Sequence, residues 1–288
     1  MVVIGVLGVS LSSILVRYST SPSAVTAAYR MGFTVLLLTP MVLSKAERRN
    51  ELKQLKLSTL GLSILCGTFL AAHFALWFES LQHTTVASST TIVCSDAIWV
   101  ALGYRLFLKG KLSGKAAIAI AVAFGGSVLI ACADSSASGM HLYGDVLALT
   151  AAIAIAGYTL IGSVVRTNTS TSVYTFIVYT VCAAVLVITC VVQGHSLIGY
   201  GVRSIAVGLL LAIFSTLLGH SVFSWCLKYF SPAFVSSAKL CEPVEAAILA
   251  AILFGELPAP LQLLGSALIL AGVTRYSRLE NTKARGTL

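Results

Sequence analysis

Hydrophobic residues along the chain fall into long runs separated by short polar breaks. Ten runs can be placed, at residues 2–19, 23–44, 58–81, 84–108, 113–133, 141–166, 171–193, 203–228, 232–254 and 258–277. A transmembrane helix needs roughly 20 mostly apolar residues, and the runs lack the strict two-residue alternation of a barrel strand. The pattern therefore predicts an all-α membrane protein with ten transmembrane helices.

Composition excludes a water-soluble fold. The 288 residues are 57% hydrophobic and only 10% charged, with a mean hydropathy of +0.94. A soluble domain carries about 25% charged residues, which it needs to cover its surface. The net charge of +9 does not indicate a nucleic-acid partner, because Lys and Arg cluster in the breaks. The first run starts without a basic leader segment, so we expect it to be a span and not a signal peptide.

The basic residues also predict an orientation. One alternating set of breaks, together with the C-terminal tail, holds fifteen Lys and Arg residues, whereas the opposite set holds only Arg17 and Arg203. Loops rich in Lys and Arg stay in the cytoplasm. We therefore expect a multi-pass protein of the inner (cytoplasmic) membrane with both termini in the cytoplasm.

Motifs of cofactor and metal chemistry are absent from the sequence. All seven cysteines lie inside predicted spans and none has metal-site spacing, so small buried fillers are favoured over ligands or disulfides. The phosphate-binding and dinucleotide-binding glycine patterns do not occur, and neither do the H-E-x-x-H and G-x-S-x-G signatures. We expect no cofactor, no metal and no enzymatic activity.

An internal repeat divides the chain. Shifting the sequence by 147 places residues 61–125 on 208–272 without a gap, and Gly61, His73, Ser89, Cys94 and Gly125 each meet an identical residue. Each half holds five predicted spans, an odd number, so the second half must enter the membrane from the opposite side. Inverted repeats of this kind allow two half-structures to exchange conformations around a midplane site.

The residues of the repeat resemble the drug/metabolite transporter superfamily, in particular its ten-helix EamA-type members. The most specific stretches are Cys241-Glu242-Pro243-Val244, Phe254-Gly255-Glu256 and residues 261–272, with further similarity at Ser21-Pro22, His73 to Trp77 and residues 86–89. The first half departs from the pattern, because Ser95-Asp96 replaces the Glu-Pro pair. The resemblance implies two inverted five-helix repeats and export or exchange of small metabolites. We place the first repeat at residues 1–137, the second at 138–280, and a cytoplasmic tail at 281–288.

Charged residues inside the predicted spans are the candidates for a site. They are Arg30, Asp96, Lys239, Glu242 and Glu245. A charge at the bilayer centre costs about 2.5–3.5 kcal/mol on insertion scales, so such residues pair or line a wet pathway.

Glu242 is the leading candidate for binding substrate and for carrying a proton. It lies halfway along its span and precedes Pro243, which can kink the helix near Lys239. The alternative is a structural ion pair with Lys239 on one helix face.

Asp96 occupies the middle of its own span, one position beyond the repeat counterpart of Glu242. Trp99 follows three residues later on the same face, so the two could hold a cationic or aromatic solute. Asp96 could instead pair with Arg30 or Lys239, with Trp99 in helix packing, and Arg30 could instead bind a substrate carboxylate.

Two histidines recur at equivalent repeat positions. His73 and His220 could pass protons, or make interhelical hydrogen bonds. His73 shares a face with Trp77, which makes both candidates for the substrate site. Trp77 and Trp225 also lie near span ends, where an interfacial aromatic belt is the favoured interpretation. Tyr158 is a candidate wall residue.

These residues predict a secondary transporter for a small organic metabolite, with an amino acid or related compound as the best guess. We expect alternating access, protons as a possible coupling ion, a lipid environment, and a monomer or homodimer. A channel-like facilitator and, less favoured, a membrane-embedded enzyme are the alternatives.

Overall fold

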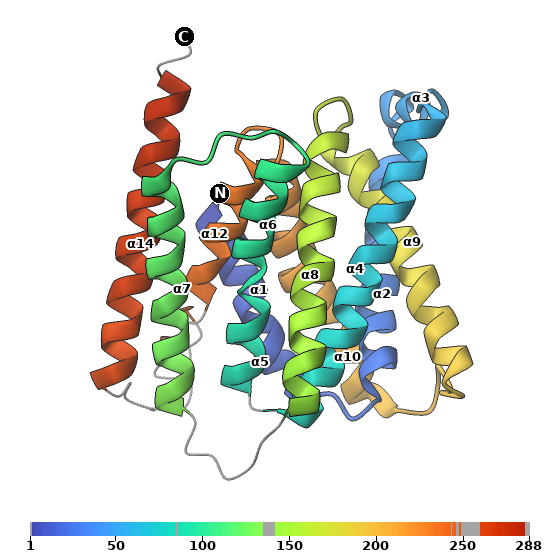
Figure 1. The fold of residues 1–288 in the computed structure, drawn as a ribbon. Helices are drawn as coiled ribbons and strands as arrows, with labels where there is room; N and C mark the ends of the chain where they lie inside the picture. Colours follow the sequence, from blue (N-terminus) through green and yellow to red (C-terminus); the bar gives the residue numbers. More distant parts are fainter. Residues whose placement is uncertain are drawn as a thin grey trace.

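The computed structural model describes residues 2–84, 86–134, 142–242, 244, 245, 248 and 260–285. Within these residues the protein is a bundle of helices without a strand (Figure 1). The all-α membrane class predicted from the hydrophobic runs is confirmed.

The helices follow the predicted runs closely. They are α1 (Val2–Arg17), α2 (Ser23–Leu43), α3 (Ala46–Lys53), α4 (Leu57–His83), α5 (Val86–Val93), α6 (Asp96–Leu106), α7 (Gly114–Asp134), α8 (Leu142–Val165), α9 (Thr171–Val192), α10 (Gly201–Leu210), the π-helix η1 (Leu211–His220), α11 (Ser221–Cys226), α12 (Pro232–Ala238), the 3-10 turn η2 (Lys239–Cys241) and α14 (Pro260–Arg285).

Length and composition make five stretches of the described chain able to cross a membrane. These are α2, α4, α8, α9 and the continuous segment Gly201–Cys226. Val2–Val16 and Gly114–Leu129 form shorter apolar helices. The total of ten crossings stays a prediction, since the other described segments do not meet both the length and the hydropathy that a crossing requires.

Two polar stretches differ from expectation. The break between residues 45 and 56 contains the exposed helix α3, whose Arg48 and Arg49 donate to carbonyl oxygens at the end of α2. The last helix runs on to Arg285, so residues 281–285 of the predicted tail are helical.

Two helices are interrupted at corresponding places in the two halves. A turn at Cys94 and Ser95 separates α5 from α6, and α12 gives way to the 3-10 turn η2. The kink predicted at Pro243 concerns a residue outside the described part of the chain. The 3-10 turn already ends the regular α-helix before that proline.

The packing fits a two-repeat architecture. The helices α7 and α14 pack against each other and run in opposite directions, as do the halves to which they belong (Figure 1). The contact of α4 with α8 has its counterpart in the contact of η1 with α1. Such reciprocal contacts are those that a pseudo-two-fold axis produces.

Close contacts between α7 and α14 determine which residues of the two halves are equivalent. A Cβ on Gly126 would lie 2.5 Å from the carbonyl oxygen of Gly265, and a Cβ on Gly272 would lie 2.6 Å from that of Ala119. These two contacts are reciprocal only if residues 146 apart are equivalent. The match of Gly125 with Gly272, at a shift of 147, is therefore one residue off in this part of the chain.

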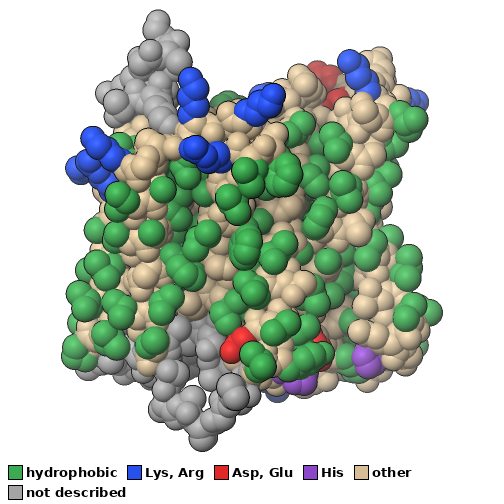
Figure 2. All heavy atoms as spheres, in the orientation of Figure 1, with side chains coloured by type: hydrophobic (Ala, Val, Ile, Leu, Met, Phe, Trp, Pro, Cys, Tyr) green, Lys and Arg blue, Asp and Glu red, His purple; other side chains and the backbone are tan. Residues whose placement is uncertain are grey.

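Lys and Arg side chains gather at one end of the molecule (Figure 2). This end also carries α3 and the C-terminal part of α14 (Figure 1). The placement agrees with the loop grouping used for the orientation, and the cytoplasmic location of this end stays a prediction.

Replacing Gly126 should separate α7 from α14, whereas replacing its neighbour Gly125 should not. In Gly126→Ala the new methyl group would meet backbone, and overpacking costs about 1–3 kcal/mol. Around Gly125 nothing lies within 4 Å of a Cβ, so Gly125→Ala should be neutral or stabilise the helix by up to about 1 kcal/mol. Thermal unfolding in detergent measures both variants, and equal melting temperatures would contradict the contact.

Candidate functional site

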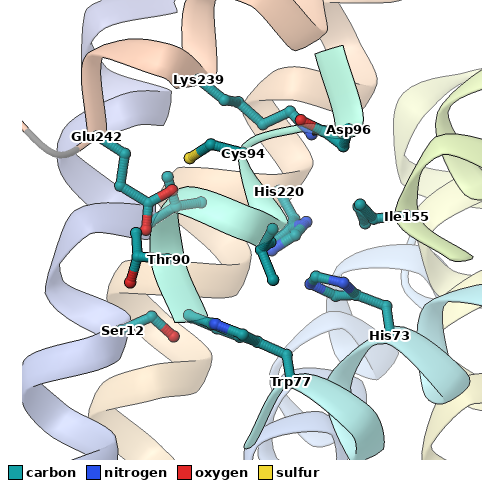
Figure 3. Close-up of a pocket in the computed structure, with 12 residues that line it drawn as sticks. Ser12, His73, Trp77, Thr90, Cys94, Asp96, Ile155, His220, Lys239 and Glu242 are labelled. Atoms are coloured by element: carbon teal, nitrogen blue, oxygen red, sulfur yellow. Dashed lines mark hydrogen bonds and ion pairs between the residues drawn. The ribbon is translucent and has the colours of Figure 1, made fainter. Parts of the chain in front are cut away.

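A pocket lies where the two interrupted helices face α1, α4 and the segment η1 (Figure 3). Its walls come from both halves of the chain. The lining residues are Val9, Ser12, His73, Trp77, Thr90, Val93, Cys94, Asp96, Ile155, His220, Lys239 and Glu242. The prediction had singled out six of them: His73, Trp77, Asp96, His220, Lys239 and Glu242.

Asp96 is neutralised by partners from the second half. It begins α6, and its side chain is almost fully buried. The Lys239 ammonium forms an ion pair with Asp96 Oδ2, and the Ser236 hydroxyl donates to the same oxygen at 2.7 Å. A negative charge is also favoured in the first turn of a helix. Of the two partners considered for Asp96, the structure thus selects Lys239 and not Arg30.

Glu242 has no such direct partner. Its carboxylate points into the pocket (Figure 3), and it forms no hydrogen bond or ion pair with a described residue. The 146-residue register makes Glu242 the repeat equivalent of Asp96, and makes Val93 the equivalent of Lys239. The alternative of a direct ion pair between Lys239 and Glu242 is not formed, because the Lys239 ammonium reaches across the halves to Asp96. The broken symmetry leaves the Glu242 carboxylate without a directly paired cation among the described residues.

Two buried polar groups that line the pocket also lack a partner among the described residues. They are the indole nitrogen of Trp77 and the hydroxyl of Thr90, whose side chains are more than nine-tenths buried. Burying a polar group without a hydrogen bond costs free energy. Figure 3 shows Thr90 and Trp77 on the side of the pocket that Glu242 and Ser12 also face.

Trp77 is buried and not an interfacial anchor. Its ring stacks on His73 with 5.8 Å between centroids. The belt interpretation is thus wrong for Trp77, since α4 extends to His83 and keeps this ring inside the bundle. Trp225, by contrast, is only partly buried and packs against Tyr229.

The two histidines meet inside the bundle, with 6.5 Å between ring centroids. His73 Nδ1 lies 3.0 Å from the carbonyl oxygen of Ala151, as the interhelical alternative predicted. Because a carbonyl accepts, Nδ1 carries the hydrogen, and in the neutral ring Nε2 is then an acceptor. His220 ends the π-helix η1, and such π segments often occur at functional sites.

Arg30 stands behind the pocket wall. It is fully buried, donates to Thr216 at 2.8 Å and to Ser12 at 3.0 Å, and stacks over Phe74. It neither contacts Asp96 nor lines the pocket. Since Ser12 accepts from Arg30, the Ser12 hydroxyl has its own hydrogen to offer elsewhere, and the positive charge of Arg30 acts on the pocket through this contact.

Two candidates fall outside the pocket. Trp99 is 36% exposed and is not among the lining residues, because a three-residue step along α6 turns it by about 60° from Asp96 toward the lipid. Tyr158 is buried, but its hydroxyl bonds Ser224 at 2.8 Å and its ring contacts His220 from behind. Glu245, the remaining charged candidate, likewise does not line the pocket, and it accepts a hydrogen bond from Ser10.

The prediction missed Ser12, Thr90 and Val93. Each is an ordinary residue on an apolar helix, so nothing in the pattern of charges marks it. The correct repeat register would have marked two of them, since Thr90 and Val93 are the equivalents of Ser236 and Lys239.

In the described chain no three His, Cys, Asp or Glu side chains are grouped so as to hold a metal ion. The pocket presents the Asp96–Lys239 ion pair, a Glu242 carboxylate that has no direct partner among the described residues, and neutral hydrogen-bond donors.

An all-helical membrane bundle with two opposed halves and a polar pocket between them defines a transport protein. The chain belongs to the EamA-like transporter family, whose model matches residues 1–132 and again residues 142–277. The resemblance stated from the motifs is confirmed, and with it a small-molecule substrate and a lipid environment.

Similar proteins agree with this assignment. An uncharacterized transporter of Clostridium kluyveri is 26% identical over 258 residues, which are 86% of this chain and 81% of the relative. The uncharacterized transporter YxxF of Bacillus subtilis is 26% identical over 78% of this chain and 73% of its own. A protein crystal structure with 13% identity matches with a TM-score of 0.80, covering 98% of this chain and 96% of its own, which supports the fold.

The pairing of Asp96 with Lys239 can be tested by a double-mutant cycle. Asp96→Asn leaves a buried ammonium without its carboxylate, and breaking one side of a buried pair costs about 3–5 kcal/mol. Adding Lys239→Met to Asp96→Asn should restore much of the loss, because both charges are then removed. Melting temperatures of the two single variants and the double variant decide the matter. Additive losses would show that the two side chains do not interact.

Proposed function

We propose that this protein is a secondary transporter that moves a small organic metabolite across the inner membrane by alternating access. The observation that carries the proposal is the Glu242 carboxylate, which has no direct partner among the described residues and lies in a pocket where interrupted helices of two inverted halves meet. Intramembrane charges are retained where they serve a pathway or a substrate. We propose efflux or exchange, with both termini in the cytoplasm.

The pocket suits a substrate with both a positive and a negative group. Glu242 can accept an ammonium group. The Trp77 N–H, the Thr90 hydroxyl and the Ser12 hydroxyl can donate to a carboxylate, and Arg30 lies directly behind Ser12. An amino acid or a related compound presents these two groups close together, and it would satisfy the donors that now lack partners.

The two halves also suggest how the site changes during transport. Ser236 donates to Asp96, and the equivalent donor in the other half, Thr90, lacks a partner beside the equivalent acid, Glu242. If the halves exchange conformations, Thr90 should donate to Glu242 in the state open to the other side. The pocket would then present a different set of donors to the substrate in each state.

Contacts between the halves occur at both ends of the bundle. At one end Glu51 accepts from the backbone N–H of Ser170 at 2.6 Å, and at the other end Thr84 donates to Asp145 at 2.8 Å. A carrier must open one end while the other stays closed. Contacts at both ends favour a carrier over the channel-like alternative, and a membrane-embedded enzyme has no support from a catalytic grouping of residues in the pocket.

A ligand-binding screen tests whether the pocket is the substrate site, because variants inside the pocket can be compared with matched variants outside it. Purified protein is screened by thermal shift against amino acids and related metabolites. A ligand that stabilises the wild type should bind Trp77→Phe and Glu242→Gln with an apparent affinity at least ten-fold lower. This factor corresponds to about 1.4 kcal/mol, the loss expected for one hydrogen bond to a charged group.

The matched controls for this screen are Trp99→Phe and Glu245→Gln, which alter residues of the same types outside the pocket. Both should keep the wild-type affinity. A ligand that binds all four variants equally would show that the pocket is not its site.

Proton coupling is proposed for the site, with Glu242 as the leading carrier and Asp96, His73 and His220 as further candidates. In proteoliposomes, a proton gradient should drive accumulation of the substrate by the wild type. Glu242→Gln, which cannot exchange a proton, should keep counterflow when the substrate concentration is raised to offset its weaker binding, but it should lose the response to the gradient. Transport that is indifferent to pH and to the gradient in the wild type would remove the coupling. Flux without counterflow would favour the channel-like alternative.

A further inference from the structure

A second cavity lies on the outside of the bundle and is separate from the polar pocket. It is a groove between α4, α8 and the end of α6, lined by Leu62 and Phe69 of α4, by Leu160, Ile161 and Val164 of α8, and by Phe107. No polar side chain contributes to its walls. Phe107 is 78% exposed and Val164 is 42% exposed.

The groove results from small residues at helix contacts. Gly157 of α8 faces the ring of Phe69, and a Cβ at this position would lie 3.0 Å from that ring. Gly103 of α6 likewise admits the side chain of Leu160, which a Cβ would meet at 2.3 Å. The helices therefore approach each other closely at the floor of the groove, and an open space remains between their outer side chains.

The groove covers about two thirds of one leaflet along α8. It runs from Gly157 to Val164, eight residues or about 10 Å, and Val164 is next to the last residue of the helix. A leaflet is roughly 15 Å of hydrocarbon, half of a core of about 30 Å. The groove thus starts at the basic end of the bundle and covers much of one leaflet. A lipid acyl chain occupies the same part of the bilayer.

Positive charge lies at the open end of the groove. Arg105 and Lys109 flank Phe107 and Leu108 in sequence, and both basic side chains are exposed. The turn is fixed, because Lys109 has a φ of 50° and the N–H of Gly110 donates to the carbonyl oxygen of Tyr104 at 2.9 Å. Residues 97–133, which include the end of α6 and the turn, contain no Asp or Glu. Figure 2 shows basic side chains above hydrophobic ones on this face.

We propose that this groove binds an anionic phospholipid, with one acyl chain between α4 and α8 and the phosphate against Arg105 and Lys109. Basic residues beside a cleft between membrane helices are the usual recognition site for acidic headgroups. The charge at the rim favours this occupant over a second copy of the chain, whose own basic end would be repelled.

The test is a lipid titration on the full-length protein in detergent. Phosphatidylglycerol should raise the melting temperature at lower concentration than phosphatidylcholine with the same acyl chains. In the double variant Arg105→Gln/Lys109→Gln, the apparent affinity for phosphatidylglycerol should fall by roughly 25-fold, about five-fold for each charge near the membrane surface. The response to phosphatidylcholine should not change.

Two further variants make the result specific. Lys45→Gln/Lys53→Gln removes two exposed charges around α3 and should keep the wild-type preference for phosphatidylglycerol. Val164→Trp fills the groove from its exposed side and should weaken both lipids. Equal effects of the two lipids on the wild type, or equal losses in the two double variants, would overturn the proposal. The proposal would also be overturned if light scattering gave Val164→Trp a smaller particle mass than the wild type while its response to lipid stayed the same. The groove would then be an interface between two copies of the chain.

Discussion

A bilayer offers no hydrogen-bond partners to a polypeptide backbone, and this constraint governs where the helices can be interrupted. Each unsatisfied group costs several kcal/mol in hydrocarbon, so irregular backbone survives only where protein or a wet cavity surrounds it. The turn between α5 and α6 keeps its bonds by shifting to three-residue steps, with Ser95 N–H donating to Ile92 and Ile98 N–H to Ser95. Both interruptions open toward the polar pocket, which makes the site a consequence of the same constraint.

The two halves differ in the residues that surround their acids, and this asymmetry determines the charge distribution in the pocket. A perfect two-fold repeat would give both acids the same partners. Here Asp96 has Lys239 and Ser236, whereas Glu242 faces Val93 and a Thr90 hydroxyl that lacks a partner. Asp96 is thereby held in an ion pair, and we propose that Glu242 is the leading acid for exchanging a proton or binding a cation. The π-helix η1 adds to the difference, since the equivalent part of α4 is a regular α-helix.

The positions of most helices could be predicted from the sequence, because apolar runs and the breaks between them can be located along the chain without knowing how the helices pack. It also identified the charged residues of the site, since their cost in lipid marks them individually. It could not identify the partner of Asp96, because Lys239 lies nearer in sequence to Glu242 and only the packing of α12 against α6 decides between the two acids. Ser12 and Thr90 became visible only as hydroxyl groups facing a pocket. The repeat was found at a shift one residue too long for α7 and α14, since few identities fix it in so uniform a composition.

The register of the repeat links the fold to the mechanism. With residues 146 apart as equivalents, the two acids, the two donors Thr90 and Ser236, and the positions Val93 and Lys239 form three matched pairs around one pocket. Only the lysine is without a polar counterpart. Lys239 pairs directly with only one of the two acids. We propose that a conformational exchange which moves Lys239 away from Asp96 is accompanied by a proton or by the ammonium group of a substrate, because a buried acid that loses its partner is costly. Movement of the halves would then be coupled to the occupancy of the site.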